Sequence, residues 1–154
     1  MLRPATEGEI PAVAALIAAY PMQLLAQSEG WLREIAAEDG GAVLIWDRGG
    51  IDGVAVLEWA YPGVVYLMNL GLARPGRGEG QAFLSAVQAY VFGTMGAHRM
   101  YCDIAFDNAT ALTAFAKAGF VMEGTMRECW DRGSGIWVDC HAFGMLAREW
   151  RARA

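Results

Sequence analysis

The residues best suited to chemistry lie in a glycine-rich loop between an apolar segment and an amphipathic one. Residues 76–80 read Gly-Arg-Gly-Glu-Gly, after the apolar run 66–72 and before the amphipathic run 81–93. An anion can approach a glycine backbone closely, and the first N–H groups of a helix have no internal partner. These N–H groups, the helix dipole and the charge of Arg77 suit a pyrophosphate. A glycine-rich surface turn is the plain alternative.

Other phosphate-binding loops fit this segment less well. A Walker loop ends in Gly-Lys-Ser/Thr, whereas Gly80 is followed by Gln81 and Ala82. A Rossmann loop has the spacing GxGxxG in the first strand–helix unit, whereas residues 76–80 have the spacing GxGxG and follow several predicted strands. A dinucleotide or Walker-type nucleotide site is therefore disfavoured.

Two segments in the correct order resemble the signatures of the GNAT superfamily of N-acetyltransferases. Residues 77–82 are similar to its acetyl-CoA pyrophosphate motif, and residues 108–120 are similar to its second signature. Residues 123–128 and 135–139 resemble the C-terminal hairpin of the ribosomal-protein and phosphinothricin acetyltransferase branches. The resemblance implies one GNAT domain over residues 1–154, with acetyl-CoA as co-substrate.

The same resemblance implies a coenzyme site between the fourth and fifth strands. Backbone groups of the fourth strand would pair with the pantetheine arm, and Leu70 or its neighbour would hold the thioester carbonyl with an N–H group. Asn108 would contact pantetheine, cap the following helix, or do both. The implied coenzyme-binding residues are Leu70, Gly71, Leu72, Arg77, Gly78, Glu79, Gly80, Gln81, Asn108 and Phe115.

Two positions depart from the family pattern. Pro75 replaces a Gln or Arg and lacks an N–H group that could bind phosphate, while Arg74 offers a nearby charge. Phe115 stands where many members have the tyrosine that protonates the departing thiolate, and phenylalanine cannot donate a proton. Cys102, Tyr101 or water could substitute, and the sequence does not choose among them.

A base must accept the proton of the attacking amine. We predict that Asp103 and Tyr66 are the catalytic residues. Tyr66 occupies the place of the glutamate of histone-type members, and Asp103, five residues before Asn108, matches the acid of the ribosomal-protein branch. A solvated carboxylate at a strand end is the plain alternative for Asp103. Glu58 and Glu128 are weaker candidates.

These positions lead to two functional hypotheses. The first is an N-acetyltransferase that moves an acetyl group from acetyl-CoA to a primary amine of an amino acid, small amine or peptide N-terminus, by direct attack in a ternary complex. The alternative is an acyl-CoA-binding regulatory or interaction module with weak or lost catalysis. The predicted acceptor pocket is aromatic and apolar, and its residues are Tyr20, Pro21, Met22, Trp31, Trp130 and Trp137.

Hydrophobic periodicity predicts the elements that must position these residues. They form a mixed α/β sheet of about six to seven strands with helices on both faces. The predicted strands are 2–5, 42–46, 54–59, 64–72, 99–104, 120–130 and 137–146. The first predicted helix begins at Thr6, and the others cover 24–37, 81–93 and 108–118. Glu9 completes a capping box with Thr6.

Composition excludes several other classes. The net charge of −5 disfavours a nucleic-acid binder, and no apolar run reaches the length of a membrane span. The N-terminus lacks a signal-peptide core, so we expect a cytoplasmic protein, as a monomer or homodimer. The cysteines Cys102, Cys129 and Cys140 have no CxxC spacing, so we expect neither a disulfide framework nor a zinc site.

Overall fold

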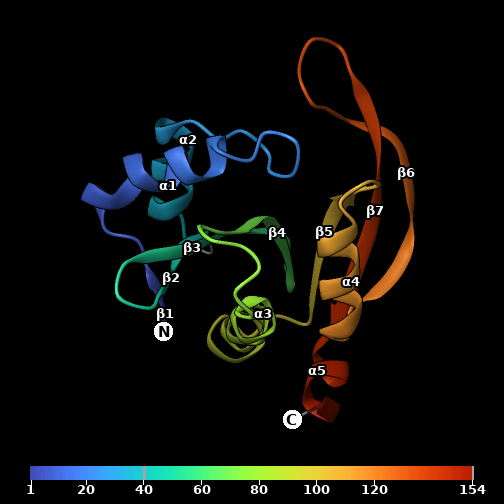
Figure 1. Ribbon diagram of the computed structural model, residues 1–154. Coiled ribbons are helices and arrows are strands. Elements are labelled where there is room, and N and C mark those ends of the chain that lie inside the picture. Colours follow the sequence, from blue (N-terminus) through green and yellow to red (C-terminus); the bar gives the residue numbers. More distant parts are fainter. Residues whose placement is uncertain (40, 154) are drawn as a thin grey trace.

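A computed structural model describes residues 1–39 and 41–153. It contains a seven-stranded mixed sheet with the strand order β1-β2-β3-β4-β5-β7-β6, in which only β4 and β5 run parallel (Figure 1). The strands are β1 (Leu2–Pro4), β2 (Ala42–Asp47), β3 (Ile51–Tyr61), β4 (Val64–Leu72), β5 (Arg99–Ala105), β6 (Val121–Asp131) and β7 (Trp137–Leu146). The helices are η1 (Glu7–Glu9), α1 (Ile10–Ala18), α2 (Glu29–Ala37), α3 (Gly80–Ala89), η2 (Tyr90–Thr94), α4 (Ala109–Lys117) and α5 (Ala147–Arg153).

Helices cover both faces of the sheet, as the alternating strand pattern predicts. On one face α1 and α2 pack Val13 and Leu32 against Val43 and Val56 of the central strands. The other face carries α3 and α4 over a second core that includes Phe83, Phe115, Leu57 and Met100. Since neighbouring residues of a strand point to opposite faces, the fully buried runs of β2 and β3 supply both cores. The predicted fold class is confirmed.

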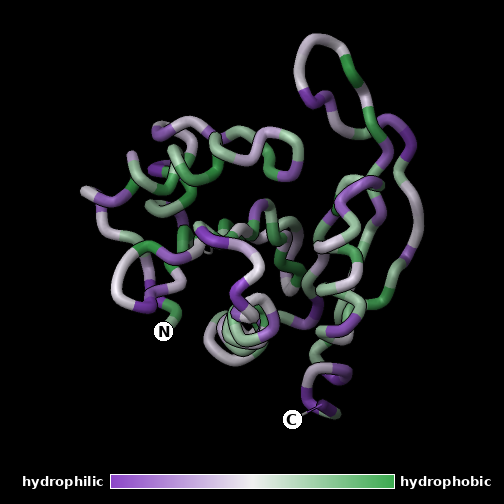
Figure 2. Tube along the Cα trace, viewed as in Figure 1, coloured by the Kyte–Doolittle hydropathy of each residue, from purple (hydrophilic) through white to green (hydrophobic). Residues whose placement is uncertain are grey.

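Two elements differ from the prediction. The helix predicted over 24–37 begins only at Glu29, where Ser28 caps it by accepting a hydrogen bond from the Trp31 N–H at 3.0 Å. The residues before Ser28 instead form a loop that contacts β4. Helix α5 was not predicted, because it is short and mostly charged, and Figure 2 shows it as largely hydrophilic. Among the described residues, no helix is both long and apolar enough to span a membrane.

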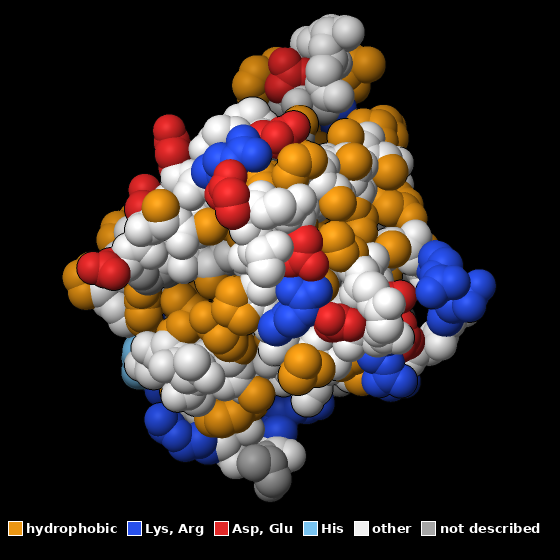
Figure 3. Space-filling model, turned by 90° about the vertical axis from the view of Figure 1, so that its left-hand side faces the viewer, with side chains coloured by type: hydrophobic (Ala, Val, Ile, Leu, Met, Phe, Trp, Pro, Cys, Tyr) orange, Lys and Arg blue, Asp and Glu red, His pale blue; other side chains and the backbone are white. Residues whose placement is uncertain are grey.

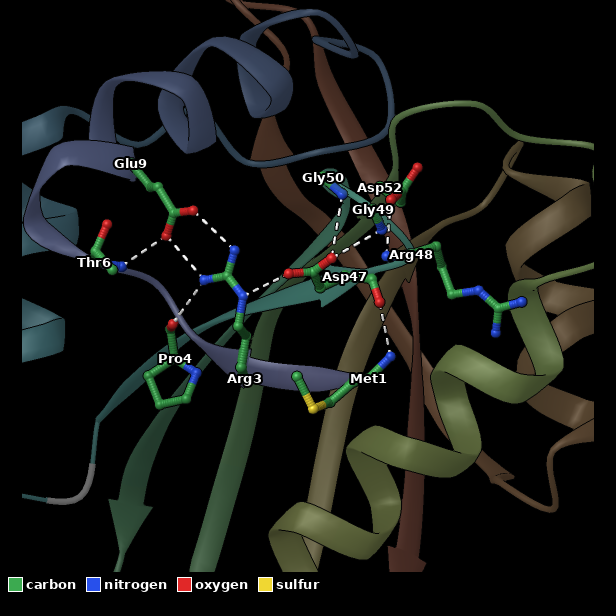
Figure 4. Close-up of polar contacts among 10 residues, drawn as sticks. All are labelled: Met1, Arg3, Pro4, Thr6, Glu9, Asp47, Arg48, Gly49, Gly50 and Asp52. Carbon is green, nitrogen blue, oxygen red and sulfur yellow. Dashed lines mark hydrogen bonds and ion pairs between the residues drawn. The ribbon is translucent and has the colours of Figure 1, made fainter.

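The first strand is held in place by the guanidinium of Arg3 (Figure 4). Its Nε donates to Asp47 Oδ2 at 2.7 Å, and its terminal nitrogens donate to the Glu9 carboxylate at 2.8 and 3.0 Å. Glu9 also accepts the Thr6 N–H at 2.8 Å, as the predicted capping pair requires. Arg3 therefore connects β1, β2 and the start of the first helix. Its hydrogen bonds lower the pKa of Glu9 to about 2.

Replacing Arg3 should make the thermal stability of the protein less dependent on pH in the acidic range. Glu9 has a folded pKa below its ordinary value of 4.5, so its contribution is complete above pH 4.5 and is lost as the pH falls toward 2. We expect Arg3→Met to lower Tm at pH 7 and to flatten the fall of Tm between pH 4.5 and 2. Arg33→Met is the matched control, because the ion pairs of Arg33 join exposed carboxylates. An acid limb in Arg3→Met as steep as that of the unmodified protein would contradict this role.

Candidate functional site

The central feature of the site is a gap that opens between β4 and β5. The two strands pair only where Val64, Val65 and Tyr66 face residues 99–101. Beyond Tyr66, β4 continues beside β3 while β5 continues beside β7, so the two strands separate. The backbone groups of residues 67–72 that point away from β3 therefore face the gap. Met68 is the extra residue of a bulge in β4, and it lies beside this opening.

A first cavity lies inside this gap, and it brings together three of the predicted coenzyme-binding residues. Leu70, Asn108 and Phe115 line it, together with Gln23, Leu24, Leu67, Met68, Asn69, Cys102, Asp103, Ile104 and Ala111. Asn108 caps α4, with its Oδ1 accepting the Ala111 N–H at 3.2 Å, so its predicted capping role is confirmed. The same side chain faces the cavity, which leaves its amide nitrogen available to a ligand.

Phe115 belongs both to the core and to the wall of the first cavity. Phe115 is only 6% exposed, and its ring packs on Phe120 and Phe143, with ring centroids 4.9 and 6.5 Å away. The Cys102 thiol lines the same cavity, and burial raises its pKa above the ordinary value. Cys102, one of the groups that could substitute for the tyrosine, thus borders the cavity with a thiol that stays protonated.

The glycine loop follows β4 and leads directly into α3. Gly76 and Gly78 have φ values of +83° and +77°, a left-handed conformation that glycine adopts without strain. A Cβ atom placed on Gly76, Gly78 or Gly80 would meet nothing within 4 Å, so the outer side of the loop is open. Within the described chain, Arg77 forms no ion pair. The loop thus presents an open backbone and an unpaired guanidinium.

Two predicted residues of this segment have side chains that are already engaged. The Glu79 carboxylate accepts Arg48 Nε at 3.2 Å, and Gln81 Nε2 donates to the carbonyl of Ala114 at 3.0 Å. Gln81 therefore tethers α3 to α4. Only the backbone N–H groups of these two residues remain for an anion at the helix start.

A second cavity adjoins the first and contains both predicted catalytic positions. The Tyr66 hydroxyl donates to Asp103 Oδ1 at 2.6 Å, and the Tyr66 ring stacks on Tyr101. Burial, and then the charge of Asp103, raise the pKa of Tyr66 above its ordinary value, so the phenol stays protonated and acts as a donor. The second cavity is lined by Gln23, Leu25, Tyr66, Met68, Asn69, Asp103, Ala105, Cys129, Trp130 and Cys140. Asp103 borders both cavities.

Sequence reasoning missed the polar residue that closes this region. Asn69 is buried in β4, accepts the Leu25 N–H at 2.9 Å and donates to the Leu25 carbonyl at 2.8 Å and to Gln27 Oε1 at 2.7 Å. These bonds hold the loop after α1 across both cavities. In the sequence, Asn69 is a single amide side chain within the otherwise apolar segment 64–72. A polar side chain buried in this way needs a hydrogen-bonding partner, and this is the signal that could have found it.

Most residues of the predicted acceptor pocket do not gather around the second cavity, and their role toward an acceptor stays a prediction. Of the six residues predicted, only Trp130 lines the second cavity. Trp31 and Trp137 are 37% and 54% exposed, and the Tyr20 hydroxyl donates to the carbonyl of Ala73 at 3.2 Å. Neither Glu58 nor Glu128 lines either cavity among the described residues. Trp137 begins β7 in the β6–β7 hairpin, whose tip extends away from the sheet (Figure 1).

Four features together define the GNAT fold. They are an antiparallel meander, an opening between β4 and β5, a glycine loop after β4 and the helix α3 that follows this loop. Spermidine N-acetyltransferase SpeG from Vibrio cholerae, in complex with CoA and spermine, is 19% identical with a TM-score of 0.81 and covers 98% of this chain and 97% of its own. A mutant of SpeG is 17% identical with a TM-score of 0.85, covering 99% and 98%. The ribosomal-protein-alanine N-acetyltransferase from Brucella melitensis is 21% identical with a TM-score of 0.79, covering 95% and 99%. At the level of sequence, neither a family model nor a curated protein matches the chain.

Phe115→Tyr should be tolerated, because its ring borders a cavity into which a hydroxyl can project. We expect a Tm close to that of the unmodified protein, and turnover that is equal or higher if thiolate departure limits the rate. Phe120→Tyr is the matched control, since Phe120 is 5% exposed and lines neither cavity. An unpartnered hydroxyl there should cost about 1–3 kcal/mol of unfolding free energy. Equal losses of Tm in both variants would place Phe115 in a dry core.

Proposed function

We propose that the protein is an N-acetyltransferase that moves an acetyl group from acetyl-CoA to a primary amine. One observation carries this proposal: Asp103, held by Tyr66, borders both the cavity in the β4–β5 gap and a second cavity beside it. One cavity suits the coenzyme arm and the other suits the amine, so a carboxylate stands where the two substrates would meet. The relatives in fold named above act on amines according to their names, which supports this proposal.

The coenzyme would lie along the open edge of β4. Backbone groups of Leu70, Gly71 and Leu72 would pair with the pantetheine arm, and Asn108 would donate to it from the opposite wall. The N–H groups of residues 77–81, with the Arg77 charge, would bind the pyrophosphate at the start of α3. Phe115 would contact the arm near its sulfur, because it lies two helical turns after Asn108.

The bound ammonium would first lose one proton to solvent, and the neutral amine would then attack the thioester carbonyl and form a nitrogen–carbon bond. A backbone N–H group near Leu70 would stabilise the oxyanion. The nitrogen would lose a proton to Asp103, directly or through one water, and the carbon–sulfur bond would break to release thiolate. Asp103 could then return this proton to the thiolate, so no separate acid is needed. Tyr66 acts as a positioning residue by fixing the carboxylate.

The acceptor would be a cationic amine on a partly apolar body. The second cavity offers the Asp103 carboxylate beside the side chains of Leu25, Met68 and Trp130. In this setting a carboxylate attracts an ammonium group, and the apolar walls hold its carbon chain. Figure 3 shows acidic, basic and hydrophobic groups interspersed on one face of the molecule. The nearest branch of the superfamily, a monomeric or homodimeric state and a cytoplasmic location stay predictions.

The second candidate function is an acyl-CoA-binding module with weak catalysis. Phe115 favours it, because the position lacks a proton donor for the thiolate. Release of free thiol in the presence of a panel of amines separates the two functions. Coenzyme binding without amine-dependent thiol release would support the module.

Gly80→Glu should weaken coenzyme binding strongly without unfolding the protein. Gly80 has ordinary backbone angles and open space at its Cβ position, whereas Gly78 has a positive φ that would strain any side chain. The new carboxylate would occupy the anion site and repel phosphate. Calorimetry with acetyl-CoA should give at least a roughly tenfold weaker Kd, an effect of about 1.4 kcal/mol. Gly80→Ala adds a methyl group without charge and should bind nearly normally. Unchanged affinity in folded Gly80→Glu would remove the loop from the site.

Asp103→Asn should lower turnover by roughly 10²-fold or more, because the amide keeps the shape and loses the basicity. The Kd of acetyl-CoA should change little. Glu58→Gln is the matched control, since Glu58 lies on β3 opposite Tyr66 and lines neither cavity. Equal turnover of Asp103→Asn and Glu58→Gln across the full pH profile would remove Asp103 from the mechanism.

A further inference from the structure

A cluster of metal-ligand types lies in the wall of the second cavity. One oxygen of Asp103 and the Sγ atoms of Cys129 and Cys140 all lie within 4.8 Å of one another. The three residues come from β5, β6 and β7, and all three line the second cavity. The amine-transfer chemistry proposed above uses the carboxylate and leaves both thiols without a role.

A bulge in β6 brings the two cysteines together. Met126 and Trp130 of β6 face Cys140 and Val138 of β7, so three residues of β6 lie opposite one residue of β7. Within this bulge Glu128 has φ +45°, and its N–H donates to Asp139 Oδ1 at 2.8 Å. Asp139 thus stabilises Glu128 in a left-handed backbone conformation, which is unfavourable for a residue other than glycine. The bulge turns Cys129 toward Cys140.

The ligand types match a zinc-class cation. Zinc binds thiolate at about 2.3 Å and carboxylate oxygen at about 2.0 Å, so tetrahedral ligand atoms lie about 3.3–3.8 Å apart. The three ligand atoms, all within 4.8 Å of one another, lie close to this spacing. The hydrogen bond from Tyr66 orients the carboxylate, as outer-shell partners of metal ligands do. With three protein ligands, the fourth position opens on the cavity.

The surrounding charges permit a cation. The guanidinium of Arg132, whose charge acts on Cys140, is paired with the carboxylate of Asp107. His141, the neighbour of Cys140, points to the other face of β7, where its Nδ1 lies 2.9 Å from Thr125 Oγ1. The cluster therefore comprises two thiols and one carboxylate.

We propose that Asp103, Cys129 and Cys140 bind one zinc-class divalent cation in the second cavity. The bound cation takes the Asp103 carboxylate and the space beside it, so it competes with the amine acceptor. The competition rests on the proposed function, whereas the binding itself does not. The sequence predicted no zinc site, because the cysteines lack the CxxC spacing that marks one.

Metal titration of the full chain tests the binding in the absence of coenzyme and amine. The protein is kept reduced with a phosphine and titrated with Co²⁺, whose thiolate charge-transfer absorption reports cysteine ligands, and then with Zn²⁺ by calorimetry. We expect one site per chain and at least a roughly tenfold weaker Kd in Cys129→Ser and in Cys140→Ser. Cys102→Ala, which changes the remaining cysteine, is the matched control and should bind Zn²⁺ normally. Circular dichroism checks the folding of each variant.

Two results would overturn the proposal: no charge-transfer band with Co²⁺, or the same Zn²⁺ affinity in folded Cys129→Ser as in Cys102→Ala. The competition is measured as the ratio of acetyl-transfer rates without and with Zn²⁺. This ratio should fall toward one at high amine concentration, and it should be smaller in Cys129→Ser than in the unmodified protein. Zinc binding without any acetyl transfer would refute the proposed function and leave the metal site standing.

Discussion

The early end of the ladder between β4 and β5 is the constraint on which the rest of the site depends. Backbone N–H and C=O groups must be paired or solvated, so a sheet rarely opens in its middle. Here three residue pairs hold the two strands together, and each strand then continues with its outer neighbour. The unpaired edge of β4 supplies the donors and acceptors that a linear amide-bearing ligand such as pantetheine needs. The same opening places Asp103 of β5 where both cavities meet.

Buried polar contacts keep this opening from collapsing. Asn69 ties the loop after α1 to β4, and the hydrogen bond between Tyr66 and Asp103 joins the two separating strands just beyond their last pair. Since an unpartnered buried polar group costs about 1–3 kcal/mol, each of these contacts resists shifts that would break it. A carboxylate placed in this way stays aimed at the cavity without help from a ligand.

Local patterns in the sequence predicted the scaffold better than the walls of the site. The bounds of β4, the loop before α3 and the capping role of Asn108 follow from apolar runs, glycines and helix-cap chemistry, which act over a few residues. The start of α2 was predicted at residue 24 and lies at Glu29. Leu24 and Leu25 are apolar because they belong to the loop that contacts β4, and not because they form a helix. The roles of the loop residues toward coenzyme stay predictions.

The meeting of Cys129 and Cys140 shows why the walls were harder to predict. Eleven positions separate the two cysteines, and regular pairing continued from the Met126–Cys140 pair would place Cys129 opposite Trp137, away from Cys140. Only the bulge around Glu128 changes which side chains meet, and its left-handed residue is not a glycine that the sequence would flag. Bulges at Met68 and near Glu128 border the two cavities, and each departs from the regular pleat that sequence periodicity describes. The irregular positions that periodicity cannot predict are therefore those that shape the site.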